Sequence, residues 1–311
     1  MSPSLPSRSS LSPAVDVPGL HRDVLDWYAV HARALPWRDP SCSPWGVLLS
    51  EVMAQQTPLA RVEPAWREWM ERWPTPEVLA AASPADVVRA WGRLGYPRRA
   101  LRLREAAIAI VERHGGEVPR AQDDLLSLPG IGDYTAAAVA AFAFGDRSVV
   151  VDTNVRRVEA RLISGQEQAA PSLTRAEKDL ARNLLPVVDH DAAVWNVAVM
   201  ELGALVCTAR APRCPDCPVR GRCAWLLGGR PAYDGPARRG QKWHGTDRQV
   251  RGIIVQTLRD AHVPVDRGDL APGRDEVQVD RCLAGLIEDG LVEPVGAHHF
   301  SLPGHDEAQA G

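Results

Sequence analysis

The chain has no hydrophobic run that approaches the length of a membrane span, so we expect no membrane partner. Its first residues, MSPSLPSRSSLSPAV, lack the apolar segment of a signal peptide, which favours a cytoplasmic protein with reduced thiols. The formal net charge is −3, and so there is no overall positive charge to attract nucleic acid. An alternating apolar pattern is also missing before residue 260, which argues against a sheet in most of the chain.

Positive charge is instead concentrated locally. Six arginines and no acidic residue lie between Arg89 and Arg104, and ten Lys or Arg accompany three Asp between Cys207 and Arg251. Solvated helix faces also carry such runs, so the pattern leaves both a plain surface and a DNA-binding surface open.

The length of 311 residues suits about two domains. The ends, 1–17 and 304–311, are expected to be disordered tails. Residues 18–227 predict one helical domain, because apolar side chains recur there at three-to-four spacing almost throughout. A basic linker rich in Gly and Pro follows at 228–245, and a second module occupies 246–303.

Two serines in the helical domain are expected to be N-caps. Ser83 stands before Pro84, and Ser172 precedes a helix expected over 174–185. Serine hydroxyls accept hydrogen bonds from the free amide groups of a first helical turn.

The last module predicts a winged-helix-like α+β arrangement. Helices are expected over 246–261, near 267–270 and over 275–288. A short strand over 263–266 is expected between the first two helices, and two short strands around Gly296 follow the third. Many winged helices bind protein or only pack, so DNA contact by this module stays open. His298, His299, Phe300 and Ser301 lie at or just past the turn, where they could contact a partner base. The alternative is that Phe300 packs into the module's own core and the two histidines are solvated.

Four of the six cysteines lie within seventeen residues, in the spacing C-x6-C-x2-C-x5-C: Cys207, Cys214, Cys217 and Cys223. Four thiolates this close repel one another unless a cation lies between them, so the pattern predicts a metal or cluster site. Structural zinc usually shows two CxxC pairs, and here there is one, which leaves zinc and a 4Fe–4S cluster both open. Cys42 and Cys282 are expected to be ordinary thiols.

A Leu-Pro-Gly-Ile-Gly turn begins at Leu128. Gly130 and Gly132 allow a sharp turn that exposes amide groups at the start of the next helix. Such a helix start can hold a DNA phosphate, although a plain helix-helix turn fits the motif equally well.

Five motifs then occur in order and at matching distances: LLSEVMAQQT at 48–57, RLGYPRRA at 93–100, LPGIGDYTAAAV at 128–139, VVDTNVRRV at 150–158 and NVAVMELGALVC at 196–207. With the four cysteines they resemble the MutY family of adenine DNA glycosylases, in the helix-hairpin-helix superfamily of endonuclease III. The resemblance implies a mainly α fold, with a six-helix barrel and an iron–sulfur cluster domain. It also favours a 4Fe–4S cluster over zinc in the loop at 207–223.

Base removal breaks a glycosidic bond, which requires an acid to protonate the purine and an anion to stabilise the sugar cation. Glu51 lies in an apolar helix stretch, where desolvation would raise its pKa and keep it protonated. The resemblance makes Glu51 the general acid and Asp152 the anion, with Asn154 positioning the site. A buried ion pair is the alternative for an isolated Glu.

Tyr134 separates two kinds of relative. Endonuclease III-like lyases resemble this region but carry a Lys at that place, and Lys forms a Schiff base with the sugar. Tyr134 cannot, so the sequence predicts a monofunctional glycosylase. A thymine or uracil mismatch glycosylase of the same superfamily is the nearest alternative, and a non-catalytic iron–sulfur DNA-binding or redox-sensing protein is another.

The resemblance also implies residues that contact DNA. Gln56 and Tyr96 match residues that enter the duplex near the partner base, as flipping of the target base requires. The base pocket and remaining DNA contacts are expected at Arg33, Trp37, Arg38, Gly130, Gly132 and Met200. The expected partner is double-stranded DNA with adenine opposite 8-oxoguanine or guanine, bound by a monomer associated with the nucleoid.

The chain departs from the family pattern at three places. Val197 stands where the family usually has Gln or Glu, and Ala54 replaces a larger pocket residue. Many MutY enzymes also carry a Nudix-like domain that recognises 8-oxoguanine, whereas only about 66 residues follow Gly245 here. Recognition of the partner base is therefore expected to differ.

Overall fold

The structure is a computed structural model that describes residues 15–235 and 243–304. It is mainly helical, as the sequence predicts, with a small three-stranded sheet near the C-terminus. Among the described helices, none combines the length and the apolar character needed to cross a membrane. The expected tails at 1–17 and 304–311 and the linker at 228–245 lie partly outside the described residues, although Val17 already begins the first helix.

The chain divides into two compact units. The described residues of the first unit are 15–38 and 136–235, and those of the second are 39–135 and 243–304. The helices of the first unit are α1 (Val17–His31), η1 (Pro36–Arg38), α9 (Thr153–Leu162), α10 (Arg175–Leu184), α11 (Asp189–Leu205), η3 (Cys214–Asp216), η4 (Arg220–Arg222) and α12 (Ala224–Leu227).

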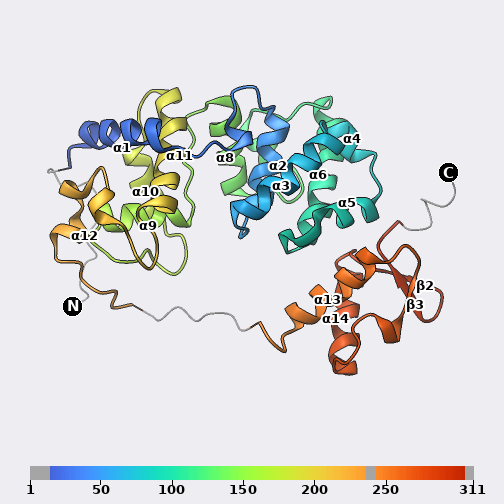
Figure 1. Cartoon of the computed structure of the whole chain (residues 1–311). Helices are drawn as coiled ribbons and strands as arrows, with labels where there is room; N and C mark the ends of the chain where they lie inside the picture. Colours follow the sequence, from blue (N-terminus) through green and yellow to red (C-terminus); the bar gives the residue numbers. More distant parts are fainter. Residues whose placement is uncertain (1–14, 236–242, 305–311) are drawn as a thin grey trace, which may run out of the picture. The chain divides into compact units, whose positions relative to one another are not determined.

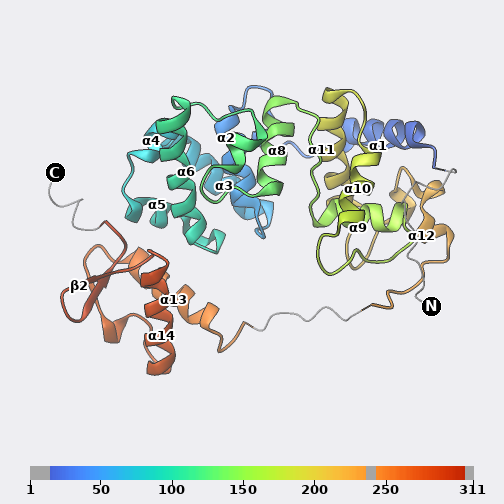
Figure 2. The same cartoon turned by 180° about the vertical axis from the view of Figure 1, so that it is seen from behind.

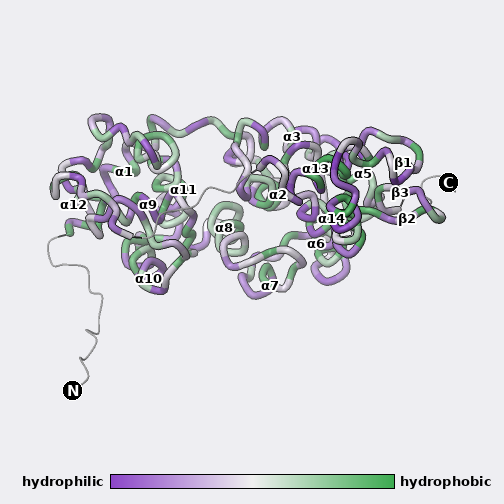
Figure 3. The backbone as a smooth tube through the Cα atoms, turned by 90° about the horizontal axis from the view of Figure 1, so that it is seen from below, coloured by the Kyte–Doolittle hydropathy of each residue, from purple (hydrophilic) through white to green (hydrophobic). Residues whose placement is uncertain are grey.

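The second unit contains α2 (Pro44–Ala54), α3 (Leu59–Arg72), α4 (Pro76–Ala80), α5 (Pro84–Trp91), η2 (Gly92–Leu94), α6 (Arg98–His114) and α7 (Gln122–Leu126), followed after the gap by α13 (Asp247–Asp260), η5 (Arg267–Asp269) and α14 (Glu276–Glu288). Helix α8 (Asp133–Phe144) begins in the second unit and continues in the first. Its alanine-rich sequence is mostly pale green in the hydropathy colouring of Figure 3.

Helix α11 packs against both α1 and α9 in the first unit, and the three lie together in Figures 1 and 2. The buried side chains of this core include Leu20, Val24, Trp27, Val155, Val158, Leu162, Trp195, Val199 and Leu202. Burial of a Leu or Val side chain contributes about 1.5–3 kcal/mol, so this interface holds α9 firmly in place.

Three tryptophans mark the core of the second unit. Trp69 of α3 lies edge-on to Trp73 and Trp91, with ring centroids 4.8 Å and 5.4 Å away. Its indole N–H donates to the carbonyl of Ala90 at 3.0 Å, which satisfies the polar atom of a fully buried ring. This contact joins α3 to α5.

One expected N-cap is confirmed and the other is wrong. Ser83 Oγ accepts from the Asp86 amide at 3.1 Å and caps α5. The cap of α10 is Thr174 and not Ser172. Thr174 Oγ1 accepts from the Glu177 amide at 3.2 Å, while Glu177 Oε2 accepts from the Thr174 amide at 2.8 Å. This reciprocal capping box satisfies two amide groups, which Ser172 cannot do from outside the helix.

The C-terminal module has the predicted order of elements: α13, β1 (Val265–Asp266), η5, α14, β2 (Glu293–Val295) and β3 (His299–Ser301). The strands form an antiparallel sheet in the order β1-β3-β2. Phe300 packs against the module's core, which agrees with the second of the two interpretations of the turn. His298 and His299 are exposed. Ser301 is buried and binds Glu293, so its expected contact with a partner base is wrong.

The module shares a hydrophobic core with α5 of the same unit. Ala85 and Val88 of α5 belong to one buried cluster with Val250, Ile254 and Leu258 of α13. The module is therefore packed onto the helical body and is not connected to it by the linker alone.

Arg259 of α13 strengthens this contact. Its guanidinium donates to the carbonyl oxygens of Val88 at 2.9 Å and Gly92 at 2.6 Å, which lie at the end of α5. Burial lowers the pKa of Arg259 to about 10, so the group remains charged at neutral pH. Asp289 of the module also pairs with Arg98 at 2.8 Å and with Arg251.

Glu159 of α9 is a buried carboxyl group with an unpartnered oxygen. Its side chain is 3% exposed, and Oε2 has no hydrogen-bond partner. Burial, and secondarily the charge of Glu177, raise its pKa to about 8. In the unfolded chain Glu159 loses its proton above its ordinary pKa of 4.5, whereas in the folded protein it keeps the proton up to a pH of about 8. The unfolding free energy therefore falls as the pH rises from 4.5 through 8.

We expect Glu159→Gln to remove this pH dependence. Wild-type protein should lose roughly 2 kcal/mol more unfolding free energy than the variant between pH 6 and pH 8, since one pKa unit corresponds to about 1.4 kcal/mol. Urea unfolding of both proteins at the two pH values measures the difference. Parallel losses in the two proteins would show that Glu159 is not the titrating group.

Candidate active site and DNA-binding elements

Asp152 lies at the N-terminus of α9, half-buried, with its carboxylate held by three donors. Oδ1 accepts from the amides of Asn154 at 2.8 Å and Val155 at 2.7 Å, and Oδ2 accepts from Asn154 Nδ2 at 2.7 Å. Burial raises the pKa of Asp152, while these hydrogen bonds and the charge of Arg157 act in the opposite direction. The carboxylate is thus fixed in orientation while being partly withdrawn from water.

Arg157, which the sequence did not single out, connects this cap to the cysteine loop. Its Nη2 donates to Asn154 Oδ1 and to the Gly203 carbonyl, both at 2.7 Å. Its Nε donates to the Cys207 carbonyl at 2.7 Å. A continuous series of hydrogen bonds therefore runs from Asp152 to the backbone of one cysteine.

Gly203 is a second residue that sequence reasoning missed. A Cβ there would lie 2.7 Å from Asn154 Cβ and 3.0 Å from its carbonyl oxygen. Only glycine permits this approach between α11 and the start of α9. Both Arg157 and Gly203 stand inside the motifs VVDTNVRRV and NVAVMELGALVC, which were the available signal.

Arg33 and Arg38, expected in a base pocket, both bind Glu201 of α11. Arg33 donates from Nε and Nη2 at 2.7 Å each, and Arg38 Nη2 donates at 2.9 Å. Burial alone would raise the pKa of Glu201, but these two arginines outweigh it and lower the pKa to about 2. The segment that also carries the half-buried Trp37 is therefore anchored to α11, beside the partly buried Met200.

Glu51 lies in α2, which starts at the N-cap Ser43 and is almost entirely buried. Its side chain belongs to the buried set, at 9% exposed, as its apolar neighbours predict. Glu51 belongs to the second unit and Asp152 to the first.

Gln56 and Tyr96, the two expected wedge residues, share an unusual backbone. Their φ angles are 53° and 47°, and among the described residues only Arg230 is a further non-glycine with positive φ. Left-handed backbone is strained for side chains of this size and gathers at functional sites. Both residues are exposed, and Tyr96 is 41% exposed despite its aromatic ring.

A single arginine holds the two strained loops. Arg99 Nη1 donates to the carbonyls of Val52 at 2.7 Å and Gln55 at 2.8 Å, beside Gln56. Its Nη2 donates to Leu94 at 3.0 Å and Gly95 at 2.9 Å, before Tyr96. Burial lowers the pKa of Arg99 to about 10, which still leaves it charged at neutral pH.

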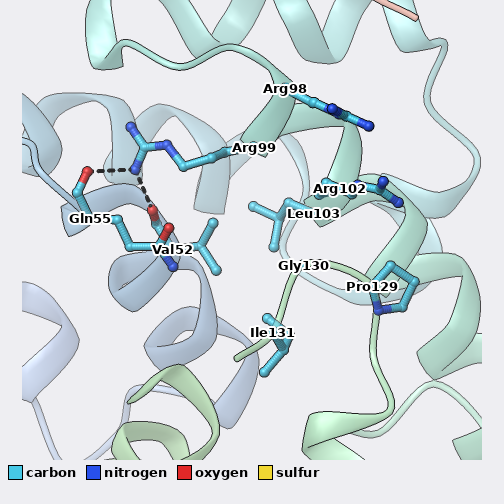
Figure 4. Close-up of a pocket in the computed structure, with 9 residues that line it drawn as sticks. All are labelled: Val52, Gln55, Arg98, Arg99, Arg102, Leu103, Pro129, Gly130 and Ile131. Carbon is cyan, nitrogen blue, oxygen red and sulfur yellow. Dashed lines mark hydrogen bonds between the residues drawn. The ribbon is translucent and has the colours of Figure 1, made fainter. Parts of the chain in front are cut away.

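A cavity of about 190 Å³ opens beside the hairpin turn in the second unit. Figure 4 shows its lining residues: Val52, Gln55, Arg98, Arg99, Arg102, Leu103, Pro129, Gly130 and Ile131. The turn thus meets the end of α2 and the arginine-rich start of α6. Tyr134 follows in the first turn of α8, where it is half-buried.

The two glycines of the turn differ. Gly130 has φ 77°, and a Cβ there would lie 2.8 Å from Arg102 Cβ. Gly132 has no positive φ, and a Cβ there would meet nothing within 4 Å. The expectation that both glycines serve the sharp turn is therefore correct only for Gly130, whereas the open space at Gly132 leaves room for a ligand.

The four clustered cysteines line one pocket with the buried Arg161 and Trp225. Arg161 Nη1 donates to Cys207 Sγ at 3.4 Å and to the Thr208 carbonyl at 2.8 Å. Burial, with the charges of the other three thiols, raises the pKa of Cys217 to about 11. Four thiolates would therefore need added positive charge here, which a metal ion or a metal cluster would supply.

No three His, Cys, Asp or Glu side chains in the described part of the chain converge on a site for a single metal ion. A tetrahedral zinc site requires such convergence on one point. A four-iron cluster is also held by four cysteines, which lie around its outside.

We expect the two glycine substitutions to separate folding from DNA binding. Gly130→Ala should lower the unfolding free energy by about 1 kcal/mol or more, because of its left-handed backbone and the nearby Arg102. Gly132→Ala should unfold like the wild type yet bind duplex DNA more weakly, because the methyl group would occupy the approach of a phosphate. Thermal unfolding and fluorescence anisotropy measure the two effects, and undiminished DNA affinity of Gly132→Ala would contradict a phosphate contact there.

Comparison with known proteins shows the family to which the chain belongs. The model of the HhH-GPD superfamily base excision DNA repair protein matches residues 49–184. Adenine DNA glycosylases of Mycobacterium tuberculosis and Mycolicibacterium smegmatis are 52% and 51% identical, over 91% and 92% of this chain and 93% and 96% of theirs. Coverage this high must extend into the C-terminal module.

Among solved structures, a thermostable thymine-DNA glycosylase superposes with a TM-score of 0.63 at 26% identity, over 68% of this chain and 97% of its own. This likeness covers about two thirds of the chain, whereas the mycobacterial likeness covers 91% and 92% of it. The chain belongs to the adenine DNA glycosylase family of the helix-hairpin-helix base excision repair superfamily.

Proposed function

We propose that this protein is a monofunctional DNA glycosylase that removes adenine mispaired with 8-oxoguanine or guanine in base excision repair. The observation that carries the proposal is the carboxylate of Asp152, held by three hydrogen bonds at the start of α9 in a family of adenine DNA glycosylases. Its substrate is double-stranded DNA, which it acts on as a monomer in the cytoplasm, at the nucleoid.

Two carboxyl groups have different roles in breaking the glycosidic bond. Glu51, buried in α2, donates a proton to the adenine ring and so improves the leaving group. Asp152 stabilises the sugar cation that forms as the glycosidic bond breaks. Asn154 donates to Asp152 Oδ2 and fixes its orientation. Different surroundings allow two carboxyl groups to take these opposite roles.

Tyr134 makes the reaction stop at base removal. A phenol cannot form the Schiff base through which an amine cleaves the strand. The chain has only two lysines, Lys178 and Lys242, and neither lies in the hairpin motif. The product is therefore an abasic site in an intact strand.

We expect Glu51→Gln to abolish adenine release and to leave DNA affinity nearly unchanged, because the amide keeps the shape but has no acidic proton. Loss of a general acid costs roughly 10²–10⁴ in rate. Single-turnover base release is measured on duplexes with A:8-oxoguanine, A:G, T:G and U:G. Near-native turnover by the variant would refute the role of Glu51, and release of thymine or uracil in place of adenine by the wild type would favour the alternative glycosylase.

Substrate binding places Gln56 and Tyr96 in the duplex. The exposed, strained loops that carry them are held by Arg99, so they can fill the gap left by an extruded base without being ordered anew. Arg33, Trp37, Arg38 and Met200 complete the base pocket and its surroundings, with Gly130 and Gly132 at the backbone of the DNA.

The four cysteines would hold a 4Fe–4S cluster, which supplies the positive charge that four half-buried thiolates require. Cys207 lies after α11, and the other three lie on short turns that carry the exposed Arg210, Arg213 and Arg220. The cysteine loop therefore presents positive charge to the phosphate backbone once it is ordered.

We expect purified protein to be brown and to contain about four irons per chain. Cys214→Ser should lose iron and bind DNA more weakly, because the loop arginines lose their fixed positions. The rate of base release from DNA that is already bound should change less than the DNA affinity. Iron analysis and binding titration measure this, with Cys42→Ser as the matched control at a thiol outside the cluster. Colourless protein with one zinc per chain would contradict the cluster.

The C-terminal module takes part in recognising the partner base, a task that a Nudix-like domain performs in many MutY enzymes. The buried core that it shares with α5 supports a fixed place for it on the DNA-binding body. Of the expected contacts at the hairpin turn, only His298 and His299 remain exposed.

A further inference from the structure

The start of the C-terminal module meets the loop of Tyr96. Arg248 of α13 lies with its guanidinium carbon 4.9 Å from the centre of the Tyr96 ring and 5.4 Å from the centre of the Trp243 ring. The three side chains form an aromatic–cation–aromatic cluster within the second unit, which we call the Tyr96 cluster.

The Tyr96 cluster is an exposed surface and not a part of a core. Trp243 is 48% exposed, Tyr96 is 41% exposed, and Arg248 is exposed as well. Large rings left in water together with an arginine are typical of surfaces that stack nucleic-acid bases, because every base offers an apolar face to them.

The contacts behind the cluster keep it in register with the Tyr96 loop. Asp289 pairs with Arg98, two residues beyond Tyr96, and also with Arg251, one helical turn beyond Arg248. Arg259, at the other end of α13, donates to Val88 and Gly92. The position of Arg248 over Tyr96 is thus supported from both ends of its helix.

We propose that Arg248 and Trp243 complete the contact surface for the purine opposite the target adenine, with Arg248 determining the preference for 8-oxoguanine over guanine. The proposal rests on the function proposed above, in which Tyr96 enters the duplex beside the partner base. 8-Oxoguanine carries a carbonyl oxygen at C8 that guanine lacks, and the flat guanidinium of arginine is suited to donate to such an acceptor on a purine edge. Trp243 supplies stacking that does not depend on the oxidation of the base.

Point substitutions test this better than removal of the module, because truncation would expose Ala85 and Val88 of α5. Arg248→Met keeps most of the side-chain length and removes the donors. Arg248→Lys keeps the charge without the planar fork. Arg274→Met is the matched control, since Arg274 is an exposed arginine of the same module outside the cluster.

The ratio of affinities for duplexes with A:8-oxoguanine and A:G is measured by anisotropy, in the Glu51→Gln background so that no base is released. Arg248→Met is expected to lower this ratio roughly tenfold, the loss typical of a base-reading arginine, and Arg248→Lys to restore little of it. Trp243→Leu is expected to lower affinity for both duplexes by about fivefold or more, the effect of a lost stacking contact. Arg274→Met should change neither.

An equal loss on both duplexes with Arg248→Met would overturn the assignment, because it would reduce Arg248 to a phosphate contact. Unchanged binding would overturn it as well. Thermal unfolding at the wild-type temperature shows that each variant is folded. Failure of the proposed function is a separate result, since it would appear as wild-type protein that releases no adenine from either duplex.

Discussion

Half-buried arginines that donate to backbone carbonyl groups hold the irregular segments of this protein in place. Arg99 ties the Gln56 turn to the Tyr96 loop, Arg157 ties Asn154 to the Cys207 backbone, and Arg259 ties α13 to the end of α5. Carbonyl groups at helix ends and in loops have no partner within a helix, so they must find donors elsewhere when water is excluded. In a helical protein the functional loops are such segments, and their order depends on these donors.

The choice of arginine follows from its charge. Burial lowers the pKa of Arg99 and of Arg259 only to about 10, so both keep every donor at neutral pH. A lysine in the same surroundings would lose its proton far more readily and offers fewer donors in no fixed plane. Only two of the 36 basic residues are lysine, Lys178 and Lys242, which agrees with this use of positive charge. Glu201 shows the complementary case, because two arginines keep a buried carboxylate ionised and so anchor the segment that contains Trp37.

The helices, the hairpin turn and the order of the C-terminal elements could be predicted because they depend on neighbours within a few residues. Spacing of apolar residues, a serine before a proline and a Gly-x-Gly turn are all local signals. Pairings between distant segments could not be predicted in this way. Nothing in the sequence around Arg33 points to Glu201, and nothing around Arg248 points to Tyr96. The wrong expectations have the same origin. Thr174, and not Ser172, caps α10, because Thr174 forms a reciprocal capping box with Glu177. Ser301 is buried because it lies on the strand β3, which packs on the module's core.

Base removal and partner-base selection make opposite demands on one chain. The proposed general acid, Glu51, would benefit from dry surroundings, whereas residues that contact a neighbouring base must remain exposed to reach it. The second unit satisfies both demands, because Glu51 is buried in α2 while Tyr96 stands on an exposed loop that the same Arg99 connects to the end of α2. The C-terminal module adds Arg248 to that loop through a shared core with α5, so its place is set by folding. A base-recognising module attached only by a flexible linker would lose conformational freedom each time it bound DNA. A module that is already packed onto the helical body avoids that loss.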